Sequence, residues 1–266
     1  MPQQEVLLCP VDTGILRGDG IFTTLLVTDG FPVFLEEHCR RLYTQAKELQ
    51  FQIIKVCSES IYELIIRNNA QKGNYRLKIC YIARGEFFQN MKLSLLLGII
   101  SSYISSHHSI RLLPYPTPIE TPLAHYKTLS YSHRYLLLEW ARIRQFDDVI
   151  TKDAKGHILE SAFANIFWMK DKTLYYPALD LPVFPGVTIE IIKKVVSCWE
   201  GYTVQKSYKP IEDIDFLAQW FISNSLLGIR PVIQIGSITT IRNHGLEQRL
   251  WKALNDTIKS SYHNSF

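Results

Sequence analysis

The sequence has little of what marks a membrane, secreted or nucleic-acid-binding protein. No apolar run approaches the ~20 residues that cross a bilayer, and no basic segment followed by an apolar one opens the chain. The 29 Lys and Arg residues exceed the 25 Asp and Glu residues by only four, and the basic residues form no run. This mild charge argues against a nucleic-acid surface and suits an enzyme of small anions. We expect a cytoplasmic protein with a small-molecule substrate and no nucleic-acid or membrane partner.

Closely spaced cysteine pairs are also lacking. The five cysteines are odd in number and scattered, and none is spaced from another as metal ligands are. Neither a disulfide framework nor a metal site is therefore predicted. We expect reduced, mostly buried thiols, as in a cytoplasmic protein. The set is Cys9, Cys39, Cys57, Cys80 and Cys198.

The sequence does contain enough apolar residues for a core, and it has one proline-rich stretch. Of the 266 residues, 47% are hydrophobic, which suffices for one large or two medium domains. Four prolines fall in residues 114–122, where their fixed φ angles disfavour helix and central strand. We therefore expect an interdomain linker over 114–122, a small N-terminal α+β domain over 1–113 and a larger C-terminal domain over 123–266.

Turn residues and hydrophobic periodicity predict an antiparallel sheet with two helices in the first domain. Residues 28–30 (Thr-Asp-Gly) separate two β-rich runs and predict a hairpin. A capping box at Ser60 and Glu63 predicts the start of the second helix, and Gly73 its end. The expected strands are 21–27, 31–35, 75–83, 92–100 and 109–113, and the expected helices are 36–50 and 60–73.

The second domain combines short strands with three helices. Apolar positions predict helices over 133–144, after Gly186 and from Leu246 onward. Residues 152–156 and 170–172 are turn-like and predict two hairpins. The expected strands are 149–151, 157–159, 164–169, 173–176, 202–206, 219–223 and 232–235.

Two ionisable residues stand at positions that suggest chemistry. Lys127 follows the proline-rich stretch and precedes a helix, where it is placed to face a cleft between domains, although most lysines are solvated charges. Glu160 lies between two apolar segments, where a carboxylate needs a partner to stay ionised. A protonated ring nitrogen or an arginine would serve, and the local sequence leaves both open.

A further group of residues is suited to an anion. Residues 185–188 (Pro-Gly-Val-Thr) precede a helix, whose free N–H groups and dipole attract anions, although an ordinary capped helix gives the same pattern. Residues 223–225 (Ser-Asn-Ser) end a buried strand, and the guanidinium of Arg41 can fork onto a phosphate. A lysine that forms a Schiff base, an acid for a ring nitrogen and a phosphate cradle are the protein's part of a pyridoxal phosphate site.

These motifs are similar to those of the class IV aminotransferases, the fold-type IV pyridoxal phosphate enzymes. The resemblance implies an α+β fold of two domains, with a smaller N-terminal α/β sandwich and a larger C-terminal domain built around a β-barrel-like sheet. It also implies a homodimer whose site lies near the subunit interface. Besides Lys127, the segments that carry the resemblance are 18–22, 38–42, 160–165, 185–188 and 221–232.

The resemblance implies a role for each matching residue. Lys127 matches the lysine that bonds covalently to pyridoxal 5'-phosphate, and Glu160 matches the acid that pairs with the pyridine nitrogen. Asn165 matches an asparagine that supports the acid. The residues expected at the cofactor phosphate are Arg41, Val187, Thr188 and Ser225, and those expected near the substrate are Phe22, Thr24, Arg84 and Asn224.

Two segments resemble the 4-amino-4-deoxychorismate lyases of this family. Thr23 and Thr24 match the lyases' double threonine, where D-amino acid aminotransferases carry an acid in place of Thr23, and 222–232 matches an asparagine-containing strand ending. The resemblance implies conversion of 4-amino-4-deoxychorismate to 4-aminobenzoate and pyruvate in folate biosynthesis. The alternatives are an aminotransferase for D-amino or branched-chain amino acids with a 2-oxo acid, and a non-catalytic relative that keeps the cofactor.

Two positions depart from the family pattern. Gln89 stands where an arginine for the substrate carboxylate is expected, so Arg84, Lys92 or a residue of a partner subunit would have to bind that group. Ile189 replaces the arginine that usually follows the phosphate-binding turn. The sequence therefore leaves open which residue binds the carboxylate.

Overall fold

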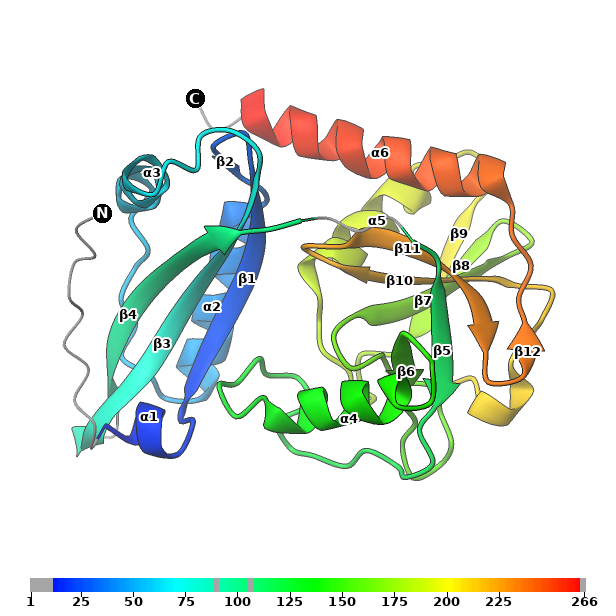
Figure 1. Cartoon of the computed structure of the whole chain (residues 1–266), viewed down its shortest axis with the longest axis horizontal. Coiled ribbons are helices and arrows are strands. Elements are labelled where there is room, and N and C mark those ends of the chain that lie inside the picture. The colour runs from blue at the N-terminus through cyan, green and yellow to red at the C-terminus, as the bar shows by residue number, and fades with distance from the viewer. Residues whose placement is uncertain (1–11, 89–90, 105–107, 264–266) are drawn as a thin grey trace. The chain divides into compact units, whose positions relative to one another are not determined.

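The computed structural model describes residues 12–88, 91–104 and 108–263 (Figure 1). The chain forms two compact units: unit 1 comprises Met1–Ser102 with Tyr126–Tyr131, and unit 2 comprises Tyr103–His125 with Ser132–Phe266. Each unit has its own sheet and helices, which confirms the two-domain α+β expectation. Within the described residues, no helix is both long and apolar enough to cross a membrane.

Unit 1 is a four-stranded antiparallel sheet with two helices packed on one face. Its elements are β1 (Gly20–Thr28), β2 (Phe31–Pro32), β3 (Asn74–Phe88), β4 (Met91–Ser102), α1 (Thr13–Leu16), α2 (Leu35–Glu48) and α3 (Ser58–Arg67). The strand order is β2-β1-β3-β4. Alternate strand residues, among them Leu25 and Leu77, form a buried core with Leu42 of α2 and Ile65 of α3.

The hairpin between β1 and β2 follows from the turn residues. Asp29 and Gly30 have φ angles of 47° and 81°, the left-handed region that aspartate and glycine tolerate. β2 has only two residues, fewer than the predicted 31–35, because Phe34 takes a φ of 54° and begins α2 as its N-cap.

The second helix differs from its prediction at both ends. α3 begins at Ser58 with Cys57 as its N-cap, and Ser60 lies inside the helix, so the predicted capping box is wrong. The helix ends at Arg67 rather than near Gly73, because Asn69 takes a left-handed φ of 54°. Asparagine reaches this conformation almost as readily as glycine, and it stops the helix earlier.

The segment Tyr126–Tyr131 pairs with the start of β1. The N–H of Phe22 donates to the carbonyl of Lys127 at 2.8 Å, and the N–H of Leu129 donates to the carbonyl of Gly20 at 2.8 Å. Gly20 permits this approach, because a Cβ there would lie 2.4 Å from Leu129 Cδ1. Lys127 therefore belongs to unit 1, whereas the sequence places it in the C-terminal domain.

Unit 2 is built on a mixed sheet of eight strands. They are β5 (Ile110–Pro114), β6 (Asp148–Ile150), β7 (Asn165–Lys170), β8 (Thr173–Pro177), β9 (Thr203–Ser207), β10 (Gln219–Asn224), β11 (Gly228–Ile235) and β12 (Ile238–Thr239). The strand order is β6-β5-β11-β10-β7-β8-β9, with β12 paired to β11. The helices are α4 (Ser132–Arg142), α5 (Val187–Ser197) and α6 (His244–His263), with a 3-10 turn, η1 (Ile211–Asp213).

β5 joins unit 2, whereas the sequence places residues 109–113 in the first domain. The strand pairs in parallel with β11 and with β6. Ile110 and Leu112 are buried in one core with Trp220 and Val232. Parallel pairing joins residues far apart in the chain, and apolar periodicity does not reveal the partner. The units thus divide between Ser102 and Tyr103 rather than at 113.

A buried carboxyl group lies at the start of β6. Asp148 Oδ1 accepts the N–H of Val149 at 2.7 Å and the N–H of Ala162 at 3.0 Å. Burial outweighs these two hydrogen bonds and raises the pKa of Asp148 from 3.8 to about 6. A pKa raised by folding contributes stability that is complete below the unfolded value and is lost as the pH rises through the folded value.

We predict that Asp148→Asn becomes progressively more stable than the wild type as the pH rises from 4 to 7. The amide oxygen keeps both backbone contacts and carries no charge, so the difference in unfolding free energy grows by about 2–3 kcal/mol. Urea unfolding of both proteins across this range measures it. A difference that stays flat with pH contradicts the assignment of the shift to Asp148.

Candidate functional site

Unit 1 places Lys127 against two aromatic rings. Its Nζ lies 5.2 Å from the ring centre of Phe22 and 5.5 Å from that of Tyr131. The two rings meet edge to face with their centres 5.2 Å apart, and Phe22 is buried. Cation–π contacts of this kind attract an ammonium group and limit the directions it can take. The lysine is therefore held on the sheet face that Phe22 occupies.

A buried chain of hydrogen bonds holds Arg41. The guanidinium Nη2 donates to Thr23 Oγ1 at 2.8 Å, and Thr23 Oγ1 lies 2.7 Å from His38 Nδ1. The Thr23 oxygen has two lone pairs and one proton, so beside accepting from Arg41 it can either accept from Nδ1–H of His38 or donate to a bare Nδ1. One hydroxyl therefore links the guanidinium to the imidazole.

The pKa shifts in this region favour a neutral His38 and a charged Arg41. Burial lowers the pKa of His38 well below 6.5, and the positive charges of Arg41 and Lys127 lower it further. Burial also lowers the pKa of Arg41 to about 10, which leaves it protonated at neutral pH. Unit 1 thus places two cations near a neutral histidine, an arrangement that favours an anion.

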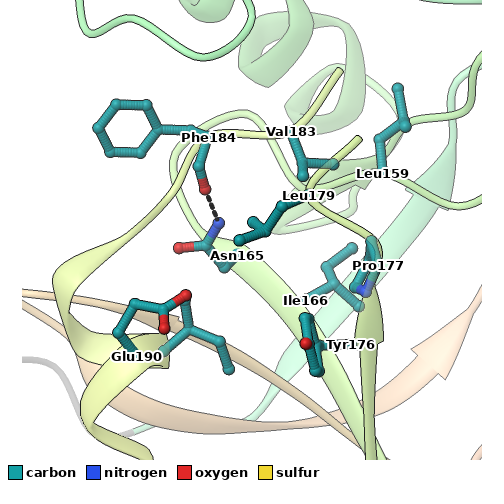
Figure 2. A pocket seen from close by; sticks show the side chains of 10 residues that line it. Leu159, Asn165, Ile166, Tyr176, Pro177, Leu179, Val183, Phe184 and Glu190 are labelled. Atoms are coloured by element: carbon teal, nitrogen blue, oxygen red, sulfur yellow. Dashed lines mark hydrogen bonds between the residues drawn. The ribbon is translucent and has the colours of Figure 1, made fainter. Parts of the chain in front are cut away.

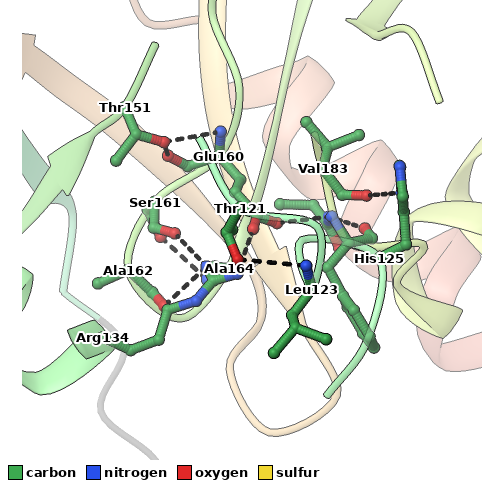
Figure 3. Close-up of polar contacts among 12 residues, drawn as sticks. Thr121, Leu123, His125, Arg134, Thr151, Glu160, Ser161, Ala162, Ala164 and Val183 are labelled. Atoms are coloured by element: carbon green, nitrogen blue, oxygen red, sulfur yellow. Dashed lines mark hydrogen bonds and ion pairs between the residues drawn. The ribbon is translucent and has the colours of Figure 1, made fainter. Parts of the chain in front are cut away.

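Unit 2 holds Glu160 between two donors (Figure 3). Arg134 Nη2 on α4 donates to Oε1 at 2.6 Å, and the N–H of Phe184 donates to Oε2 at 3.1 Å. The other nitrogen of Arg134 donates to the carbonyls of Ser161 and Ala162. Both members of the ion pair are largely buried. The arginine partner that the sequence allows is therefore present, and each oxygen retains a lone pair for a further donor.

The start of α5 has the features of an anion site. Gly186 is the N-cap and supplies no side-chain acceptor, so the first N–H groups of the helix are not capped by it. A Cβ at Gly186 would lie 1.9 Å from Oδ1 of Asn165, whose Nδ2 donates to the carbonyl of Phe184 at 2.7 Å (Figure 2). Glycine is required here because the asparagine occupies that space. Thr188 Oγ1 donates to Ser225 Oγ at 3.4 Å.

The end of β10 carries a buried hydroxyl, that of Ser223, and an amide, that of Asn224, which holds the next turn. Within the described residues, Ser223 Oγ is buried and has no hydrogen-bond partner. Asn224 Oδ1 accepts the N–H groups of Leu226 and Leu227, and its Nδ2 donates to the carbonyl of Phe163 at 3.1 Å. Asn224 therefore shapes the turn that carries Ser225.

The other residues expected near the substrate are placed as follows. Arg84 forms an ion pair with Asp12 at 3.3 Å, and Lys92 forms one with Asp19 at 2.7 Å. Thr24 is half-buried on β1. Cys9 and Gln89 lie outside the described residues.

The residues present fit pyridoxal phosphate in kind. Unit 1 holds Phe22, Thr24, Arg41, Arg84 and Lys127, and unit 2 holds Glu160, Asn165, Val187, Thr188, Asn224 and Ser225. A lysine, a guanidinium, a carboxylate, a helix start without a side-chain cap and an unpartnered buried hydroxyl are all available. In the described part of the chain, no three His, Cys, Asp or Glu side chains gather as metal ligands.

The sequence reasoning assigned no role to His38 or Arg134, and it named Thr23 only as a match to the lyases and not as a partner of Arg41. His38 precedes Arg41 by three residues, which puts both on one helix face. That spacing is the only signal for the hydrogen-bonded chain. Arg134 has no such signal, because its contact with Glu160 joins α4 to a segment 26 residues away.

We predict that Thr23→Val weakens pyridoxal phosphate binding on the order of tenfold, because the guanidinium of Arg41 loses a hydrogen-bond acceptor. Thr23→Ser keeps the hydroxyl and should bind as the wild type does. Titration of the cofactor-free protein measures the dissociation constant. Affinity for pyridoxal, which has no phosphate, should not change. An equal loss for both compounds would show that Thr23 does not act through the phosphate.

Comparison with known proteins gives one family. The family model described as class IV amino-transferase matches residues 20–235. Aminodeoxychorismate lyase of Bacillus subtilis is 25% identical over 267 residues, which covers 90% of this chain and 85% of the relative. The bifunctional aminodeoxychorismate lyase / D-amino acid transaminase of Mycobacterium tuberculosis is 25% identical over 245 residues, 84% of each chain. A solved branched-chain aminotransferase of Thermoproteus uzoniensis with norvaline has a TM-score of 0.85 at 17% identity, covering 96% of this chain and 91% of that one.

The matched span contains every residue that the sequence predicts for the site, from Phe22 to Ser225. The solved structure has the same fold, and the Bacillus subtilis relative aligns over most of both chains. The chain therefore belongs to the class IV aminotransferase family and is a pyridoxal phosphate-dependent enzyme.

Proposed function

We propose that the protein is an aminodeoxychorismate lyase that converts 4-amino-4-deoxychorismate to 4-aminobenzoate and pyruvate in folate biosynthesis. The observation that carries the proposal is Thr23, whose hydroxyl contacts Arg41 at the position where D-amino acid aminotransferases have an acid. The similarity to the Bacillus subtilis lyase over 90% of this chain supports it. We place the enzyme in the cytoplasm, because its cysteines are scattered and odd in number, and we expect a homodimer, as the family resemblance implies.

Each candidate residue has a defined task in this proposal. Arg41, Thr188, Ser225 and the first N–H groups of α5 bind the cofactor phosphate. Glu160, held by Arg134 and a backbone N–H, keeps the proton on the ring nitrogen. Bound pyridoxal phosphate supplies an electron sink for the carbon that bears the substrate nitrogen.

Lys127 moves the proton. Its Nζ, released from the cofactor when the substrate amine binds, takes the proton from the carbon next to that amine. The C–O bond at the neighbouring ring carbon then breaks, and the ring becomes aromatic as the enolate of pyruvate leaves. Lys127 returns its proton to that enolate, so no further reactant is required.

An aminotransferase is the second candidate, and the similarity to the bifunctional lyase and D-amino acid transaminase favours it. The same residues serve both reactions until the proton has been removed. In amino transfer, Lys127 would deliver the proton on the side of the bound cofactor instead, and a 2-oxo acid would be the product. A non-catalytic relative would keep the phosphate contacts and have no use for a proton-transfer lysine.

We predict that the purified protein forms fluorescent 4-aminobenzoate from 4-amino-4-deoxychorismate, and that Lys127→Arg loses this activity by at least about a thousandfold, because the proton carrier is removed. Borohydride reduction of the cofactor-bound protein should attach the cofactor to Lys127. Lys47→Arg, at the end of α2, is the matched control.

The same protein is then given an amino acid with 2-oxoglutarate. Amino transfer without 4-aminobenzoate would replace the lyase by the aminotransferase. If neither product forms and Lys127 carries the label, the non-catalytic relative is the remaining candidate. Label at another lysine would contradict the role of Lys127 itself.

A further inference from the structure

Because position 89 is Gln89 rather than an arginine, the substrate carboxylate has no assigned partner. Unit 1 contains another lysine, Lys78, which the sequence analysis did not select. Lys78 lies on β3 directly opposite Thr24 of β1. Its neighbour on the same sheet face, Cys80, lies opposite Phe22. Lys78 thus shares the sheet face of Phe22, the residue against which Lys127 is held.

Lys78 and Lys127 approach the same aromatic ring. Lys78 Nζ lies 4.6 Å from the ring centre of Phe22, and Lys127 Nζ lies 5.2 Å from it. Both amino groups are therefore close to one buried, apolar side chain. Two like charges there repel each other, and an anion bound beside them relieves that repulsion.

The other candidate cations already have carboxylate partners. Arg84 pairs with Asp12 at 3.3 Å, and Lys92 pairs with Asp19 at 2.7 Å. Binding a substrate carboxylate through either residue would require an existing ion pair to open. By contrast, no carboxylate oxygen among the described residues lies within 4.0 Å of Lys78 Nζ. Its amino group lies over the Phe22 ring.

We propose that Lys78 binds a carboxylate of the substrate whose amine reacts at Lys127. The proposal rests on the proposed function, because it assumes that Lys127 is where the substrate reacts. Lysine serves as a point charge that follows the carboxylate, where an arginine would form a rigid fork. The hydroxyl of Thr24, across the strand pair from Lys78, is placed to donate a hydrogen bond to the same anion.

The test measures binding and does not depend on turnover. Chorismate has the carboxylates of the proposed substrate and no amino group, so it binds without reacting. 2-Oxoglutarate serves as a second carboxylate. Calorimetry on the cofactor-bound enzyme gives dissociation constants for both ligands with the wild type, Lys78→Met, Lys78→Arg and Arg76→Met. Arg76 is the matched control: it lies two residues away on the same face of β3 and contacts Ser101.

We expect Lys78→Met to weaken chorismate binding on the order of tenfold or more, because a contact to a charged group is lost. Lys78→Arg keeps the charge and should stay within about threefold of the wild type, and Arg76→Met should bind as the wild type does. Cofactor affinity should be the same in all four proteins. Unchanged binding of both chorismate and 2-oxoglutarate in Lys78→Met, or an equal loss in Arg76→Met, overturns the proposal.

The results distinguish failure of the lyase assignment from failure of the Lys78 proposal. If the enzyme forms no 4-aminobenzoate but Lys78→Met weakens 2-oxoglutarate binding, then Lys78 binds the carboxylate of an aminotransferase substrate, and only the lyase assignment falls. If 4-aminobenzoate forms and Lys78→Met binds both ligands as the wild type does, then the lyase stands and the role of Lys78 is wrong.

Discussion

Two backbone hydrogen bonds attach the segment that carries Lys127 to the first strand of unit 1, and the candidate site depends on them. They join Phe22 to Lys127 and Leu129 to Gly20. Backbone pairing fixes the direction of the intervening side chain far better than a flexible loop does. As a result, the amino group of Lys127 meets the Phe22 ring, and Gly20 must lack a side chain for the pairing to form. The lack of a side chain at Gly20 therefore helps to determine the position of Lys127.

The charges of the site are organised separately in the two units. In unit 1 two lysine amino groups lie near Phe22, and His38 stays neutral because burial and the charges of Arg41 and Lys127 lower its pKa. In unit 2 the carboxylate of Glu160 is held by Arg134 before any ligand binds. Removing one member of a buried ion pair leaves the other uncompensated, at a cost of about 3–5 kcal/mol. The acid is thus oriented in advance.

The sequence predicts most helices and strands, because turn residues and apolar periodicity are local signals. By resemblance it also names candidate site residues, whose roles stay predictions. It misplaces β5 and Lys127, because both belong to their units through pairing with distant strands. It misses the Arg134 contact for the same reason, and it misses Lys78 because a lysine on a strand has no distinguishing neighbour in the sequence. Contacts between residues far apart in the chain are what sequence reading does not supply.

Thr23 shows how the residue beside Arg41 changes the charge around that guanidinium. A carboxylate at this position would place a negative charge beside the guanidinium of Arg41 and would favour a protonated His38. A hydroxyl accepts the same hydrogen bond at 2.8 Å without adding charge, and it also hydrogen-bonds Nδ1 of His38 at 2.7 Å. The threonine therefore positions the arginine and preserves its full charge for an anion. Lys127 contributes to the same positive field, because its charge also lowers the pKa of His38. A site with this balance favours substrates that carry more than one negative charge.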